Sequence, residues 1–155
     1  MALFLSTFTM KVDKKGRVSV PAPFRAAVDG GSFKGVVVYR ALKGHFLEGA
    51  DLAYLEDLSQ KIYSDFGPFD DDQMAVATAI LAGASQLPFD GDGRVLLPPD
   101  LKAFAGIEDQ ATFAGIGHKF QVWNPAAFEA HKAAQLPLAP KAAAKLTPFP
   151  PRGQS

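Results

Sequence analysis

The chain has 155 residues, 48% of them hydrophobic, which is enough for one domain with a buried core. It carries sixteen Lys and Arg against sixteen Asp and Glu, and it has no cysteine, which excludes disulfides, thiol nucleophiles and cysteine-based metal sites. No stretch approaches the roughly 20 apolar residues that span a bilayer, and the N-terminus lacks the basic region of a signal peptide. We therefore expect a cytoplasmic protein with no membrane partner.

The zero net charge conceals an uneven distribution along the chain. Residues 1–45 hold eight Lys and Arg against two acids, whereas residues 46–92 hold one Lys against ten acids. Residues 93–155 hold seven basic residues against four acids. A basic N-terminal third is the kind of field that attracts nucleic acid, and the alternative is that solvated faces simply differ in charge.

The first fifty residues predict short strands and one short helix. Apolar and polar residues alternate loosely over 3–12, which favours a strand. A turn at 13–16 leads to a second strand at 17–20, where Pro21 stops the ladder, so the two strands form a hairpin with a basic tip. A helix over 23–28 and two paired strands, at 36–39 and 46–48, follow.

The middle of the chain predicts two helices. Asp51 is a good N-cap for a helix whose apolar residues recur at helical spacing, and Phe66-Gly67-Pro68 ends it. Asp70-Asp71-Asp72 opens a second helix that runs to Gly83. Acids in a first helical turn complement the helix dipole, and we favour this explanation over a metal site.

The second half predicts the same elements as the first. A strand before Asp90, a helix over 100–104 and a hairpin of 111–116 with 120–123 precede a helix that begins at Asn124-Pro125. Beyond it, five prolines fall within residues 137–151, so we expect a disordered or only locally helical tail.

A nine-residue phrase explains this parallel, because it occurs twice. Asp13-Lys14-Lys15-Gly16-Arg17-Val18-Ser19-Val20-Pro21 is matched by Asp90-Gly91-Asp92-Gly93-Arg94-Val95-Leu96-Leu97-Pro98. Two copies indicate a duplicated half-domain. The turn and strand residues that the two copies share are then structural in both: Asp13, Gly16, Arg17 and Pro21, with Asp90, Gly93, Arg94 and Pro98.

Nothing in the sequence supports catalysis. The three histidines fall in two predicted turns and a helix, at no metal-ligand spacing, and there is no nucleophile elbow or phosphate-binding loop. We therefore expect no enzyme activity, no catalytic residue, no metal and no cofactor.

The basic hairpin is the candidate functional site. A two-stranded β-ribbon fits the major groove of B-DNA, where Lys14 and Lys15 would neutralise phosphates and Arg17 would reach a guanine edge or a phosphate, with Lys11 and Arg25 flanking them. The alternative is that Arg17 only pairs with a carboxylate inside its own turn.

The second copy separates these possibilities in part. Gly91 and Asp92 stand where the first copy has its two lysines, although the arginine is kept. We therefore expect the arginines to build the fold in both copies and the lysines to give only the first copy its affinity for DNA.

The two phrases, the opening Phe4-Leu5-Ser6-Thr7 and the segment from Gly115 to Trp123 resemble the MraZ family of bacterial transcriptional regulators, over roughly residues 3–132. The resemblance implies a mainly β fold with short helices (α+β), in which two AbrB-like swapped-hairpin halves close one β-barrel. It further implies ring-shaped homo-oligomers that bind repeated boxes in double-stranded DNA, upstream of the division and cell-wall gene cluster and of their own gene, usually as a repressor associated with the nucleoid.

The expected organisation has four parts. Residues 1–50 form the first AbrB-like half, 51–83 a helical linker, 84–134 the second half with its C-terminal helix, and 135–155 the tail. The competing function is a non-enzymatic β-barrel interaction module whose basic hairpin docks an acidic protein partner.

Overall fold

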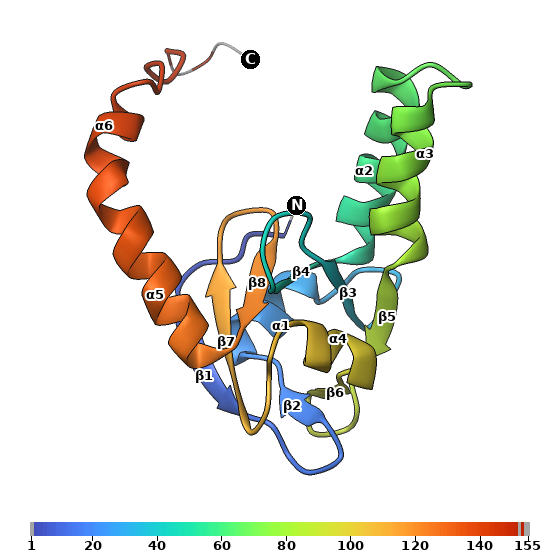
Figure 1. Cartoon of the computed structure of the whole chain (residues 1–155), viewed down its shortest axis with the longest axis vertical. Helices are drawn as coiled ribbons and strands as arrows, with labels where there is room; N and C mark the ends of the chain where they lie inside the picture. Colours follow the sequence, from blue (N-terminus) through green and yellow to red (C-terminus); the bar gives the residue numbers. More distant parts are fainter. Residues whose placement is uncertain (1, 152, 154–155) are drawn as a thin grey trace. The chain divides into compact units, whose positions relative to one another are not determined.

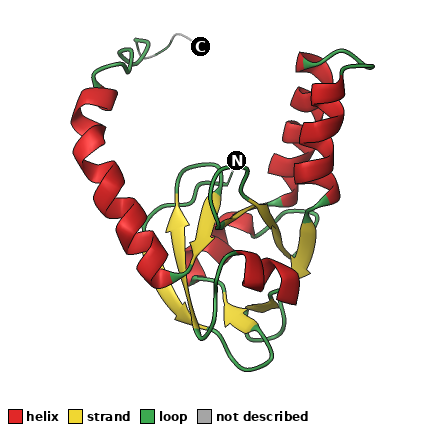
Figure 2. Ribbon diagram, in the orientation of Figure 1, coloured by secondary structure: helices red, strands yellow, loops and turns green. Residues whose placement is uncertain are grey.

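The computed structural model describes residues 2–151 and 153, and it divides into two units, Met1–Pro125 and Ala126–Ser155. The first unit is a mixed α+β structure built on antiparallel strands with short helices (Figures 1 and 2). Its elements in chain order are β1 (Thr7–Lys11), β2 (Arg17–Ser19), α1 (Ala22–Val28), β3 (Gly35–Arg40), β4 (Leu47–Ala50), α2 (Leu52–Asp65), α3 (Asp71–Ala77), a π-helical turn (Thr78–Ala82), β5 (Ser85–Pro88), β6 (Arg94–Leu96), α4 (Pro99–Phe104), β7 (Gln110–Gly115) and β8 (Phe120–Trp123).

The C-terminal part of the chain is helical. Helix α5 (Pro125–Gln135) is followed by a 3-10 turn (Leu136–Leu138) and by α6 (Ala139–Ala143). Of the predicted tail, residues 152, 154 and 155 lie outside the described residues. Among the residues that are described, no helix combines the length and the apolar character needed to cross a membrane.

The strand order shows the duplication directly. Six strands form one sheet in the order β1-β7-β8-β4-β3-β5, and β2 pairs with β6 in a separate two-stranded sheet. Strands β1 and β5 precede the two copies of the repeated phrase, while β3 and β4 follow the first copy as β7 and β8 follow the second. If each strand is replaced by its counterpart in the other half, the order is therefore the same from either end of the sheet. Four of the strand pairs join one half to the other: β1–β7, β4–β8, β3–β5 and β2–β6.

The closed β-barrel is not found among the described residues. The hydrogen-bonded order ends at β1 and at β5, and β2 and β6 are too short to bridge those ends as a continuous ladder, at three residues each. Pro21 and Pro98 follow them closely and cannot donate to a ladder. A single bridge, Val12 with Val18, connects the end of β1 to β2.

The predicted strand over 3–12 is shorter than expected. Ser6 has a φ of 76°, a left-handed backbone conformation that is uncommon for a residue with a Cβ, so β1 starts only at Thr7. The segment before it still contacts the second half, because Phe4 exchanges backbone hydrogen bonds with Gly117 (2.7 and 3.0 Å).

The helix termini follow their capping residues. Asp51 accepts a hydrogen bond from the Tyr54 backbone N–H (3.1 Å), which confirms the predicted start of α2. Asp70 caps α3 in the same way through Asp72 (2.8 Å). The predicted second helix is not uniform, because α3 ends at Ala77 and continues as the π-helical turn.

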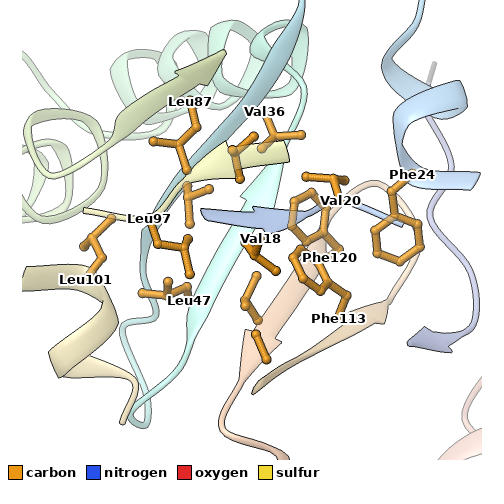
Figure 3. Close-up of a cluster of buried hydrophobic side chains, with 14 of the residues drawn as sticks. Val18, Val20, Phe24, Val36, Leu47, Leu87, Leu97, Leu101, Phe113 and Phe120 are labelled. Carbon is orange, nitrogen blue, oxygen red and sulfur yellow. The ribbon is translucent and has the colours of Figure 1, made fainter. Parts of the chain in front are cut away.

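The main core lies between the sheet, β2–β6 and the helices α1 and α4 (Figure 3). Phe24 of α1 is 1% exposed, and its ring lies 5.3 Å from those of Phe4 and Phe120. A second cluster includes Val37 and Tyr39 of β3 with Leu55 of α2 and Ile80 of the π-helical turn. Strand β3 is therefore covered on both faces, which explains its uninterrupted apolar run.

Candidate nucleic-acid interface

The β1–β2 turn is built around the Asp13 carboxylate. Its Oδ1 accepts the backbone N–H groups of Lys15 and Arg17, both at 2.9 Å, and its Oδ2 accepts Arg17 Nε at 2.7 Å. The backbone closes the same turn, since Gly16 N–H donates to the Asp13 carbonyl (3.0 Å). The three bonds to the carboxylate favour its charged form, foremost the one from the Arg17 backbone, and the pKa of Asp13 falls to about 2.

Gly16 fixes this turn to the other half of the chain. Its φ is +89°, and an added Cβ would lie 3.3 Å from the carbonyl oxygen of Leu97. The Gly16 carbonyl accepts the Leu97 N–H (3.0 Å), directly beyond the β2–β6 ladder. The conformation of the first turn is therefore set by the second half of the fold.

The lysines project from this fixed turn. Lys14 and Lys15 are exposed, as is Lys11 at the end of β1. Within the described part of the chain, none of the three ammonium groups has an ion-pair partner. With Arg17 and Asp13, residues 11–17 carry four cations and one carboxylate, a formal charge of +3.

Arg17 combines an internal bond with outward-facing capacity. Its side chain is 38% exposed and is bonded to Asp13 through Nε. Among the described residues, its terminal nitrogens make no hydrogen bond or ion pair. Arg17 therefore makes the structural pair with Asp13 through Nε, and its terminal nitrogens can still bind an anion.

The second turn has the same construction and the opposite charge. Asp90 Oδ1 accepts the backbone N–H groups of Asp92 and Arg94, both at 2.9 Å, and Arg94 Nε lies 3.0 Å from Asp90 Oδ2. These bonds, led by the one from the Arg94 backbone, lower the pKa of Asp90. Arg94 also pairs with Asp92 (3.3 Å), so its charge is matched twice. Residues 88–94 carry one cation and two carboxylates, a formal charge of −1.

Arg25 lies beside the second turn and not the first. It donates to the Val20 carbonyl, and a Cβ on Gly93 would come within 2.8 Å of its side chain. Its place in the sequence led us to group Arg25 with the first hairpin. However, β2 leads away from the first turn, and α1, which carries Arg25, begins beyond the other end of that strand. The antiparallel β2–β6 ladder places the second turn at that end, a pairing that the spacing of the two phrases alone does not reveal.

The carboxylates of the two turns have partners within the protein. The described residues contain no group of His, Asp or Glu side chains that could hold a metal ion. The carboxylates of both turns are already occupied by backbone N–H groups and arginines.

Comparison with known proteins points to one family. A family model described as "MraZ protein, putative antitoxin-like" matches residues 3–76 and 80–148. The chain is 44% identical over 136 residues to a protein of Rickettsia akari (strain Hartford), covering 87% of this chain and 91% of that one. It is 41% identical over 140 residues to a protein of Rickettsia bellii (strain OSU 85-389), covering 90% and 93%. Both relatives are named "Transcriptional regulator MraZ".

Proposed function

The chain belongs to the MraZ family, a family of transcriptional regulators and not of enzymes, and from this premise we propose that it binds double-stranded DNA through the tip of its β1–β2 hairpin. The binding residues in this proposal are Lys14 and Lys15, supported by Arg17 and Lys11. Arg25 has a smaller part, because its guanidinium is bonded inside the fold.

The observation that carries the proposal is the contrast between the two turns. They share an Asp–Arg pair, a left-handed glycine and reciprocal bonds to each other's strands, Leu97 to Gly16 and Val20 to Gly93. We regard them as the hairpins of two interlocked AbrB-like halves. Because the two turns have the same backbone construction, folding does not explain why the formal charge is +3 in residues 11–17 and −1 in residues 88–94. It is explained if only the first tip meets a polyanion.

The dimensions of the hairpin suit a duplex. A two-stranded β-ribbon enters the major groove, and exposed lysines at its tip meet the phosphates on the groove edges. The terminal nitrogens of Arg17 are then close enough to the groove to contact a phosphate or a guanine edge. The fixed turn lowers the entropy lost on binding, because Asp13 and Gly16 already hold the tip in one conformation.

One hairpin with a few charges binds weakly and with a strong dependence on salt. In our proposal, several copies assemble in a ring and present their hairpins to repeated DNA boxes, which adds roughly 10²–10⁴ in affinity without new contacts. The boxes lie upstream of the division and cell-wall gene cluster and of the protein's own gene. The bound assembly represses transcription there by excluding RNA polymerase, and the protein is associated with the nucleoid.

Fluorescence anisotropy with a labelled duplex of the gene's own upstream region tests the proposal. A triple variant, Lys14→Ala, Lys15→Ala and Arg17→Ala, should lose specific binding. A variant with Lys43→Ala and Lys61→Ala removes cations from exposed sites elsewhere and should bind as the wild type does.

Unchanged binding by the triple variant would refute the hairpin as the DNA site. If the wild type had no sequence-dependent affinity for DNA at moderate salt, the hairpin would instead serve the competing function, docking an acidic protein.

A further inference from the structure

A hollow of about 350 Å³ lies beside helix α1, where the two halves of the fold meet. Ala22 and Ala26 line it together, because residues four apart share one face of a helix. Both alanines are exposed, whereas Phe24 between them in the sequence is buried in the core. The outward face of this helix is therefore apolar where a surface helix ordinarily carries polar side chains.

The second half of the fold supplies an aromatic ring to the same hollow. Phe89 lines it, and its side chain is only partly buried. The Phe89 N–H donates to the Lys34 carbonyl (3.0 Å), directly beyond the β3–β5 ladder, so these two residues are fixed relative to each other. The exposed alanines and the phenyl ring together offer an apolar surface on which another apolar group can pack.

Two cations border this apolar surface. Arg25 donates to the Val20 carbonyl through Nη1, and within the described part of the chain its other nitrogens make no hydrogen bond or ion pair. The Lys34 ammonium is exposed and has no ion-pair partner among the described residues either. Asp29 supplies one carboxylate, so the lining residues carry a formal charge of +1.

The second half contains the counterpart of this hollow, beside helix α4. Its backbone is built in the same way, because the Val12 N–H donates to the Asp109 carbonyl (2.9 Å) as the Phe89 N–H donates to the Lys34 carbonyl. Lys34 directly precedes β3, and Asp109 directly precedes β7, the equivalent strand. The two hollows are therefore related by the duplication.

The side chains of the two hollows differ in charge and in apolar surface. Lys102 lines the second hollow with Glu108 and Asp109, so its lining residues carry a formal charge of −1. At the position of Phe89 it has Val12, which is only 3% exposed. The second hollow thus forms without a second cation and without an aromatic ring, and folding does not explain why the first hollow has both.

We propose that the hollow beside α1 binds a small aromatic monocarboxylate. The carboxylate lies between Arg25 and Lys34, and the aromatic ring packs on Phe89 and on the exposed alanines of α1. A single negative charge matches the formal charge of the hollow, whereas a phosphate dianion would leave one charge unmatched beside Asp29. The volume is near the lower end of the roughly 300–1,000 Å³ of ligand pockets, which suits a molecule of one or two rings.

This site goes beyond the proposed function and does not depend on it. Its lining residues lie outside the first turn, and the proposal stands whether or not the hairpin binds DNA. Lys14→Ala with Lys15→Ala should therefore lose DNA and still bind the carboxylate.

Titration of the full chain with naphthalene-2-carboxylate, followed in ¹H–¹⁵N correlation spectra, tests the proposal. Saturable shifts should appear in the amide signals of residues 22–34 and of Phe89, and none in residues 99–109. Naphthalene-2-carboxamide lacks the charge, and acetate lacks the rings, so each should bind at least about 10-fold more weakly. The absence of saturable shifts in residues 22–34, or equal binding of either control compound, would overturn the proposal.

Two matched pairs of variants compare the related hollows. Lys34→Glu should weaken binding of the carboxylate by about 10-fold or more, whereas Lys102→Glu should leave it unchanged. Ala26→Leu fills the first hollow without a change of charge and should abolish the shifts, whereas Ala103→Leu fills the second and should not. Unchanged binding by both Lys34→Glu and Ala26→Leu, or equal losses within either pair, would overturn the proposal.

Thermal melting supplies the second readout, because a ligand that binds only the folded state raises its melting temperature. Naphthalene-2-carboxylate should stabilise the wild type and Ala103→Leu, and it should not stabilise Ala26→Leu. The same rise in Ala26→Leu as in the wild type would place the ligand elsewhere and overturn the site.

Discussion

Replacing Lys14 and Lys15 by alanine should reduce the salt dependence of DNA binding by a predictable amount. Both side chains are exposed on a turn that is fixed by Asp13, and their removal disturbs no ion pair among the described residues. Each phosphate contact contributes about 0.9 to the slope of log K against log salt. Two contacts make affinity fall about 12-fold between 50 and 200 mM salt for each bound hairpin.

The double variant should lack this part of the slope. The assay is fluorescence anisotropy over that range of salt with a short duplex that carries one box, so that one hairpin is measured at a time. The slope should fall by about 1.8, and Lys43→Ala with Lys61→Ala should leave it unchanged. Equal slopes for the wild type and the double variant would refute the reasoning, whatever the change in affinity at one salt concentration.

Other predictions concern the second turn, the core and pH. Gly91→Lys with Asp92→Lys should raise the affinity for random duplex DNA in the same assay, because a Cβ at Gly91 meets no atom within 4 Å; unchanged affinity would contradict the importance of charge at the tip. Phe24→Ala should cost about 3–5 kcal/mol in urea unfolding, since four aromatic rings surround Phe24, whereas a loss below 1 kcal/mol would contradict its central place in the core. Gly16→Ala should cost at least about 1–2 kcal/mol, because its left-handed backbone disfavours a Cβ, and no loss would exclude that strain. The lowered pKa of Asp13 stabilises the fold above pH 3.8 and ceases to do so as pH falls toward about 2, so melting curves should decline more steeply over that interval for the wild type than for Asp13→Asn, and parallel declines would contradict it.

Local chemistry predicted most of the fold, because single residues determine where elements start and end. Asp51 and Asp70 cap the helices that were assigned to them, and the left-handed Gly16 and Gly93 close both turns. The repeated phrase predicted the duplication that the strand order shows. The break in β1 at Ser6 could not be predicted, because its conformation depends on a bond from Gly115 in the other half.

The pairing of strands between the two halves could not be predicted from the sequence, and this limited the prediction of the candidate site. The turn residues and the exposed lysines follow from the hairpin pattern, but the position of Arg25 depends on which end of β2 faces the second turn. The barrel expected from the family resemblance requires a continuous ladder through β2 and β6, and these strands have only three residues each and are followed two residues later by a proline. The exposure of the Phe69 side chain, 97%, could not be predicted either, because the sequence there shows only a break between two helices.

Hydrogen–deuterium exchange in the presence of the gene's own upstream duplex tests the central claim most directly, because it compares two related turns in one molecule. We predict that DNA slows exchange in residues 11–17 and leaves residues 88–94 unchanged. Protection of 88–94 without protection of 11–17, or no protection of either under conditions where the DNA is bound, would contradict the assignment of DNA binding to the first hairpin.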